Sequence, residues 1–263
     1  MHLIDMLRMV LATLFIVSWS VSTVHSAGQP KDSDGWQFLL EPYAWVPWVP
    51  LTTADGESIE IDGSDVVESM DMALMLIAGA RKDKWTFYLD TIYFDLQGDD
   101  TASLAAAGLP GDPTVKFNVD IGVDGWLVTA SGTYAVIDND RTRLELGGGI
   151  RYYEEKLDLK LDVGPAKASA DASWDLWDGV AMRRGFTDLN DKWYISYYAD
   201  VSTGGTDLTY QLAGMLNYRF DSFTLAGGYR YIKWEFEEDD DAPGSIVNDQ
   251  VAKGPFIGLK FFF

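Results

Sequence analysis

The most constraining feature of this chain is the alternation of side chains at its C-terminal end. From Gly254 to Phe263, apolar residues such as Ile257 and Leu259 alternate with small or charged residues, and the last residue is aromatic. Successive side chains of a β-strand point to opposite faces, so this segment predicts a strand with one apolar face and one polar or small face. The same pattern recurs along most of the chain and predicts an all-β fold.

A short apolar run near the start of the chain has the features of an export signal. Met9 to Trp19 is apolar, Arg8 precedes it, and the stretch from Val24 to Ala27 supplies small residues for cleavage. We therefore expect residues 1–27 to be a signal peptide and residues 28–263 to form a single barrel domain. The alternative is an uncleaved anchor, but the run is short for a membrane-spanning helix of ~20 residues.

Alternation and turn residues divide the rest of the chain into ten strand candidates. Short polar turns alternate with longer connections rich in Gly, Pro and acidic residues, which is typical of a bacterial transmembrane antiparallel up-and-down β-barrel. A barrel of about eight strands is the alternative, because Pro42 and Pro47 interrupt the first candidate. The candidates are Gly35–Trp48, Val66–Arg81, Trp85–Leu96, Thr114–Ile137, Arg141–Val163, Lys167–Phe186, Lys192–Thr203, Asp207–Phe220, Phe223–Glu237 and Val247–Phe263, with longer connections at 50–65, 97–113 and 238–246.

Two irregularities stand out among these candidates. The segment Leu144–Val163 would be roughly 65 Å long at ~3.3 Å per residue, too long for an apolar band ~25 Å tall, so we expect the hairpin at Gly164-Pro165 to project beyond it. The apolar parity also changes at Asp124-Gly125, which predicts a β-bulge there.

The direction of the apolar face decides between a soluble barrel and a membrane barrel. In a soluble barrel the bulky face would point inward. Here that face carries aromatic residues at strand ends, as in the girdles of membrane barrels. Together with the export signal and the terminal Phe263, this predicts an apolar outer surface and a location in the bacterial outer membrane. The strand-end aromatics are Trp193, Tyr218, Phe220, Phe223 and Phe263.

Composition excludes several classes of function. The chain contains no cysteine, so it has neither disulfides nor a lipid-anchored cysteine. The two histidines, His2 and His25, both lie in the expected signal peptide, which weighs against an enzyme with the usual histidine base. A net charge of −21 argues against nucleic-acid binding and is compatible with divalent cations or basic partners.

Several strand motifs resemble a proteobacterial outer-membrane β-barrel family of unassigned role, related to the small porin and opacity-type barrels. The resemblance implies insertion by the barrel assembly machinery, with the terminal Phe261 and Phe263 as part of the assembly signal, and it implies no reaction or substrate. The matching segments are Trp36–Trp45, Gly149–Tyr153, Trp177-Asp178-Gly179 with Arg183, Gly204–Gln211, Asn217–Phe220, Gly227–Tyr231 and Gly254–Leu259.

Projecting the alternation inward predicts a charged lumen. Acids and bases occur there in comparable numbers, so we favour a network of ion pairs that largely fills a structural, surface-interaction barrel without enzymatic function. The alternatives are a narrow, porin-like diffusion channel for small solutes or ions and, with the weakest support, a lipid-modifying enzyme. The predicted lumen residues are Glu41, Asp71, Asp90, Glu145, Asp200, Arg81, Arg143, Arg151, Arg183, Arg219, Arg230 and Lys260.

An acidic run from Glu235 to Asp241 is most simply a solvated outer loop. A Ca²⁺ or Mg²⁺ site is the sharper hypothesis, with Glu237, Glu238, Asp239 and Asp240 as ligands, because hard cations bind carboxylate oxygens. Otherwise we expect no cofactor. The expected partners are outer-membrane lipids, lipopolysaccharide and the assembly machinery.

The role assigned to the terminal aromatic residue is testable. Replacing Phe263 with Asp should lower the amount of assembled barrel without changing export, because the last strand supplies the assembly signal. Heat-modifiable migration on gels of the fractionated outer membrane measures the assembled form. Recovery of the wild type as a soluble periplasmic protein would contradict the apolar-outside assignment.

Overall fold

The computed structural model describes residues 35–52, 58–61, 63–105, 114–163, 166–235 and 249–263. The expected signal peptide lies outside these residues. Among them, no helix is long and apolar enough to cross a membrane. The long strands are β1 (Gln37–Trp45), β4 (Met70–Lys82), β5 (Trp85–Ala105), β6 (Thr114–Asp138), β7 (Thr142–Val163), β8 (Ala166–Asp188), β9 (Trp193–Gly204), β10 (Leu208–Arg219), β11 (Thr224–Glu235) and β12 (Asp249–Phe262).

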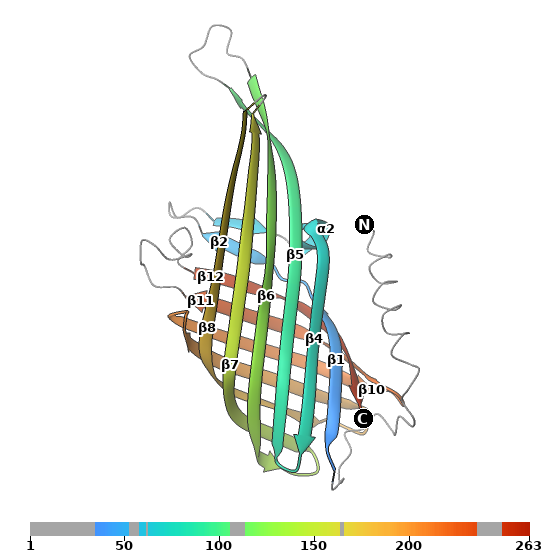
Figure 1. The fold of residues 1–263 in the computed structure, drawn as a ribbon. Coiled ribbons are helices and arrows are strands. Elements are labelled where there is room, and N and C mark those ends of the chain that lie inside the picture. Colours follow the sequence, from blue (N-terminus) through green and yellow to red (C-terminus); the bar gives the residue numbers. More distant parts are fainter. Residues whose placement is uncertain (1–34, 53–57, 62, 106–113, 164–165, 236–248) are drawn as a thin grey trace.

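Within the described residues, ten strands close into an antiparallel barrel in the order β1-β12-β11-β10-β9-β8-β7-β6-β5-β4 (Figure 1). β1 closes the ring: Leu40 lies opposite Phe261 of β12 on one side and Ala78 of β4 on the other. Pro42 pairs with Leu76 of β4, whereas the pairing with β12 passes from Leu40 directly to Tyr43. The proline, which has no N–H, is accommodated at this interruption. The expected count of ten is confirmed, and the alternative of eight is wrong.

The connection between β1 and β4 contains further regular structure. β2 (Val49–Thr52) and β3 (Ser58–Ile61) form a separate two-stranded sheet, and α2 (Gly63–Ser69) precedes β4. The sequence-based strand from Val66 therefore begins too early, because its first residues belong to this helix.

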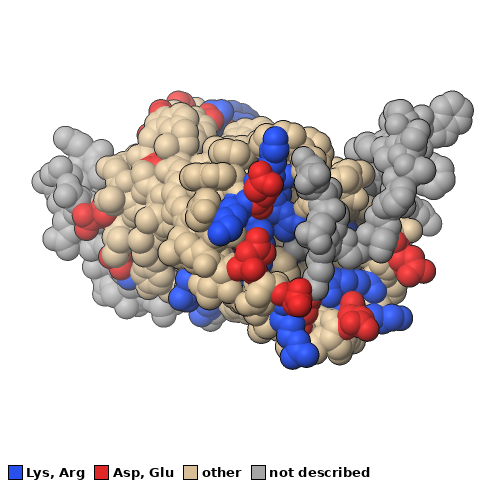
Figure 2. All heavy atoms as spheres, turned by 90° about the horizontal axis from the view of Figure 1, so that it is seen from below, with Lys and Arg blue, Asp and Glu red and all other residues tan. Residues whose placement is uncertain are grey.

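Two of the short turns of the barrel are fixed by asparagine side chains. The side-chain oxygen of Asn139 accepts hydrogen bonds from the backbone N–H groups of Arg141 and Thr142, and Asn190 does the same for Lys192 and Trp193. Such side chains stabilise tight turns by replacing a backbone acceptor. Viewed from the end that carries these turns, basic and acidic side chains are interleaved across the surface (Figure 2).

Aromatic side chains on the outer face lie at two levels. We call these the lower and upper aromatic levels: the lower level lies near the short turns of the barrel, and the upper level near its opposite end. From Trp85 to Tyr93 along β5, at ~3.3 Å per residue and a tilt of ~45°, the levels are roughly 20 Å apart. Cross-strand ring contacts mark each level: Trp85–Tyr134 and Trp193–Tyr218 below, Tyr93–Trp126 and Tyr152–Trp177 above.

The outer face between the two levels is apolar. Beyond the upper level it becomes charged, because Asp95 lies opposite Asp124, Asp124 opposite Lys156, and Glu154 opposite Asp175. An apolar band of about this height, bounded by aromatics and then by charges, is the surface that a bilayer covers. The exposed apolar residues of the band include Leu89, Leu146, Ile150, Val201, Leu212, Leu216 and Ile257.

Four strands continue above the barrel as a sheet of their own (Figure 1). β5 pairs with β4 only as far as Leu96, and β8 pairs with β9 only from Asp178. Beyond these points, within the described residues, β5, β6, β7 and β8 pair only with one another. We call residues 97–105, 114–122, 158–163 and 166–171 the projecting sheet. The expectation that the chain projects near Gly164-Pro165 agrees with this arrangement, although those two residues lie outside the described part.

Two details of the sequence-based strands are wrong here. β5 runs to Ala105 instead of ending at Leu96, because pairing with β6 continues after the apolar alternation fades outside the band. Asp124-Gly125 holds no bulge: Asp124 and Gly125 pair in register on both sides, and β6 shifts register only between Ala135 and Ile137. The apolar residues switch from one face of β6 to the other because the strand leaves the apolar band at this point. The outer face is then no longer apolar, while the pairing with β5 and β7 stays in register.

Candidate functional site: the charged lumen

In the lower lumen, near the short turns of the barrel, one buried carboxylate accepts hydrogen bonds from several side chains. Glu145 of β7 is 3% exposed and accepts hydrogen bonds from Arg143 at 2.6 Å, Thr133 at 2.8 Å, Thr86 at 2.9 Å and Tyr88 at 3.3 Å. Arg143 also pairs with Asp138 at 2.5 Å. A buried charge costs several kcal/mol unless it is paired and hydrogen-bonded, and here both conditions are met.

A second buried ion pair joins β7 to β9 across the inner face of β8. Arg151 is 2% exposed, and its guanidinium lies 2.6 Å from Asp200. Arg151 also donates to the hydroxyls of Thr129 at 3.1 Å and Ser202 at 3.3 Å. These bonds hold the planar guanidinium in one orientation.

A third group joins β11 to β5 and β1. Arg230 donates to Tyr43 at 2.9 Å, to Gln211 at 3.1 Å and to Asp90 at 3.2 Å. The Tyr43 hydroxyl in turn donates to Asp90 at 2.7 Å. Three strands are therefore tied together across the barrel interior.

The structure brings most of the predicted lumen residues together. Lys260 lies 3.6 Å from Glu41, and both are buried. Arg81 donates to Gln37 at 2.8 Å near the lower rim, and Arg219 pairs with Asp188 at 2.5 Å at the same end. The predicted residues found on the lumen side are Glu41, Asp90, Glu145, Asp200, Arg81, Arg143, Arg151, Arg219, Arg230 and Lys260.

Arg183 does not belong to this network. It is exposed on the outer face, opposite Leu146 of β7 and Ala199 of β9, and Leu146 is itself 47% exposed. The buried Val180 and Met182 show that even-numbered residues of β8 face inward here. The sequence prediction places Arg183 in the lumen because it is polar. Polar residues near it occupy both odd and even positions of β8, so polarity alone does not identify the inward face.

Asp71 is the second departure from the predicted lumen set. It is exposed and lies between Met70 and Met72, where the register of β4 with β5 shifts. The irregularity removes it from the regular alternation on which the prediction relied. Asp71 has no ion pair with any residue that the structure describes.

The remaining predicted residues stand apart from the lumen. Phe263 exchanges backbone hydrogen bonds with Phe38 at 3.0 and 3.1 Å, next to Phe261 in β12, so the terminal residue helps to close the barrel. The proposed metal ligands Glu237, Glu238, Asp239 and Asp240 lie outside the described residues. Within the described ranges, no group of three or more His, Cys, Asp or Glu is arranged to hold a metal ion.

Among the charged residues of the lumen that sequence reasoning missed are Asp178 and Arg184 of β8. Asp178 is 5% exposed and accepts hydrogen bonds from Ser202 at 2.9 Å and from Thr206 at 2.6 Å. Arg184 stacks on Tyr88, with its guanidinium carbon 3.4 Å from the ring centroid. The parity of Val180 and Met182 was the signal that could have identified both.

The upper half of the lumen is apolar instead of charged. Aromatic and aliphatic side chains from several strands pack there into one buried cluster, and Ile232 at its centre is 0% exposed. We call this group the apolar plug. Its members include Trp45, Met75, Ile92, Leu127, Tyr153, Ile232, Trp234 and Ala252, with Phe94, Trp174 and Leu176 packed against it.

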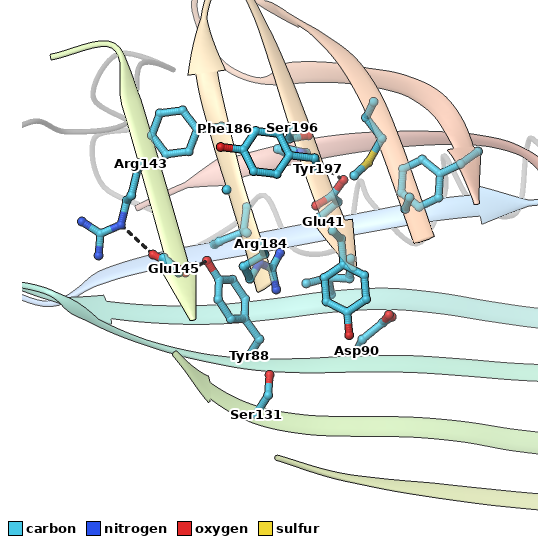
Figure 3. Close-up of a pocket in the computed structure, with 18 of the residues that line it drawn as sticks. Glu41, Tyr88, Asp90, Ser131, Arg143, Glu145, Arg184, Phe186, Ser196 and Tyr197 are labelled. Atoms are coloured by element: carbon cyan, nitrogen blue, oxygen red, sulfur yellow. Dashed lines mark hydrogen bonds and ion pairs between the residues drawn. The ribbon is translucent and has the colours of Figure 1, made fainter. Parts of the chain in front are cut away.

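A cavity of about 110 Å³ lies among the charged residues (Figure 3). Its walls carry Glu41, Tyr88, Asp90, Glu145 and Arg184. The lumen thus has a charged lower zone with a small cavity and an apolar upper zone.

One carboxylate lies at the upper mouth. Glu155 follows Tyr152 of the upper aromatic level along β7 and lies outside the membrane-spanning segment. Tyr153 donates a hydrogen bond to it. Burial raises the pKa of Glu155 to about 7, because burial disfavours the charged form.

Comparison with known proteins adds a distant structural likeness. No known protein family and no curated protein matches the chain. The translocator domain of the autotransporter NalP from Neisseria meningitidis has a TM-score of 0.44 at 12% identity, covering 98% of this chain and 95% of that one. The attachment invasion locus protein Ail of Yersinia pestis has a TM-score of 0.37 at 9% identity, covering 88% and 100%. The toluene transporter TodX of P. putida has a TM-score of 0.31 at 12% identity, covering 91% and 92%.

These neighbours are proteobacterial outer-membrane β-barrels, the kind of barrel that the sequence motifs resemble. Likeness of this size supports no inference about activity.

The position of Arg183 generates a stability prediction. It lies midway along β8 between Trp177 of the upper level and Leu189, which hydrogen-bonds to Trp193 of the lower level. An arginine at this depth costs ~2–4 kcal/mol, so Arg183→Leu should raise the free energy of unfolding by about that amount. Urea unfolding in phospholipid vesicles measures it. Lys192→Leu in the exposed turn is the control and should change little, and a less stable Arg183→Leu variant would contradict the placement.

The raised pKa of Glu155 generates a pH prediction. Because its folded-state pKa of about 7 exceeds the ordinary 4.5, the folded state binds more protons between these values, and this group destabilises the fold as pH rises through that window. Glu155→Gln removes the effect. The difference in melting temperature, variant minus wild type, should therefore increase as the pH is raised from below 4.5 to above 7. A difference that does not depend on pH would refute the assignment.

Proposed function

We propose that this protein is an integral outer-membrane barrel that acts as a structural and surface-interaction protein, with a closed lumen and no enzymatic role. The observation on which the proposal rests is the apolar plug. A water-filled pathway needs a continuous polar lining, whereas Ile232, Trp45 and Trp234 fill the upper lumen with buried apolar side chains.

The lower lumen supports the same proposal. Its ion pairs join different strands: Arg151 of β7 pairs with Asp200 of β9, and Arg230 of β11 crosses to Asp90 of β5. Narrow barrels are filled by their own side chains, and paired charges of this kind fix the strands relative to one another. The cavity beside them is small and lies below the plug.

The outer-membrane location is supported by the outer face. The apolar band between two aromatic levels fits the hydrocarbon layer, and the charged residues above it, such as Asp124 and Glu154, fit the headgroup region. The short turns then face the periplasm and the longer connections face outward, next to lipopolysaccharide.

The projecting sheet is the surface that we assign to interaction. It has two open edges, because β5 past Leu96 and β8 before Asp178 have no neighbouring strand in the described part of the chain. Residues Lys167 to Asp171 on the β8 edge are exposed. Open strand edges pair readily with other chains, so this part of the molecule is suited to contact with partners outside the cell.

Planar-bilayer recording tests the closed lumen. The wild type should show no stable conductance. Removing two plug side chains in a Trp45→Ala, Trp234→Ala double variant should produce one, because both rings lie in the upper lumen. Trp177→Ala is the matched control, since its indole is 56% exposed on the outer face and its loss should leave the barrel closed.

A reproducible conductance in the wild type would overturn the closed-lumen proposal and favour the narrow diffusion channel. Heat-modifiable migration of all three proteins verifies that each barrel is folded before recording.

A further inference from the structure

The guanidinium of Arg184 lies in the lumen with no carboxylate at ion-pair distance in the described part of the chain. It stacks on Tyr88, 3.4 Å from guanidinium carbon to ring centroid, and lies 5.8 Å from the ring of Tyr198. The charges of Glu145 and Glu41 act on it from farther away. Among the residues that the structure describes, it makes no hydrogen bond or ion pair. Stacking uses the flat face of a guanidinium and leaves the N–H donors at its edge available for a ligand.

The acids near Arg184 are already engaged by other groups. Glu145 accepts four hydrogen bonds, including one from Arg143. Asp90 pairs with Arg230 at 3.2 Å, and Glu41 lies 3.6 Å from Lys260. Each of these carboxylates therefore has a nearer cation than Arg184, which acts on Glu145 and Glu41 only as a more distant charge.

The cavity that Arg184 faces consequently has more basic than acidic residues in its wall (Figure 3). An excess of buried positive charge is unfavourable unless an anion compensates it, and Asp138, outside the wall, pairs among the described residues only with Arg143. The bases are Arg81, Arg143, Arg184, Arg230 and Lys260, and the acids are Glu41, Asp90 and Glu145.

We propose that this cavity binds a small oxyanion of the carboxylate, sulfate or phosphate class. The N–H groups of Arg184 match the paired oxygens of such an ion. The amine of Lys260 and the hydroxyls of Ser131 and Ser196 lie in the same wall and supply further donors. The site adds a ligand to the proposed function and does not depend on whether the lumen is closed above it.

Size and position restrict the ligand further. A volume of about 110 Å³ is small, although a single water needs only about 10–15 Å³ of cavity volume on the same measure. An inorganic ion or a very short organic acid therefore fits. Arg81, Arg143 and Phe262 belong to the wall and lie at the short-turn ends of β4, β7 and β12. The ion therefore enters from the periplasmic side, and the apolar plug stops it from passing through.

Inorganic phosphate at low millimolar concentration is the probe, applied to the full barrel folded in detergent. The ³¹P resonance of phosphate should broaden on adding wild type, and the melting temperature should rise saturably with phosphate. Arg184→Gln should lose both effects. Arg183→Gln is the matched control, because it removes the same charge from the neighbouring residue on the outer face, and it should keep both.

Two outcomes would overturn the proposal: no broadening with folded wild type, or the same response in both variants. The second would assign the effect to surface charge or to general salt stabilisation. Should Arg184→Gln fail to fold, Arg184→Lys keeps the charge but loses the paired N–H groups, and it should bind phosphate more weakly than wild type.

Discussion

The architecture depends on one requirement: in a lipid environment, every backbone N–H and C=O group must find its partner within the protein. Strands can meet it only by closing into a ring. Here closure depends on β1, which pairs with β12 at one edge and β4 at the other, and the last residue, Phe263, bonds back to Phe38. The interruption at Pro42 falls on one side only, so the ring remains continuous through β4.

Closure also determines what the interior must contain. A ten-stranded ring encloses a space that alternate side chains occupy, and this chain fills it in two ways. Below, charges are neutralised in pairs such as Arg151 with Asp200; above, apolar groups pack around Ile232. The lower zone ties strands together through charge, and the upper zone through apolar packing.

Much of the fold was predictable from the sequence, because alternation and turn residues are local signals. The strand count, the tight turns and the inward position of Arg151 and Arg230 follow from parity within single strands. The errors arise where the direction of a side chain depends on how its strand pairs with a neighbouring strand. Asp71 lies at a register shift that only the pairing with β5 reveals, and the parity change at Asp124 reflects the end of the apolar band, a level set by the whole barrel. The free guanidinium of Arg184 could not be foreseen, since it depends on which acids other strands have already neutralised.

The adjacent arginines of β8 have a consequence for the fidelity of assembly. Sliding β8 by one residue would exchange Arg183 and Arg184, so one guanidinium would again face lipid and one the lumen. Charge at these positions therefore does not distinguish the correct alignment from its nearest error. The distinction must come from other side chains of the strand. The carboxylate of Asp178 would leave Ser202 and Thr206 and enter the outer surface, and the buried Val180 and Met182 would leave the lumen with it. Correct assembly of this strand is therefore decided by one buried acid and its apolar neighbours, not by its two adjacent arginines.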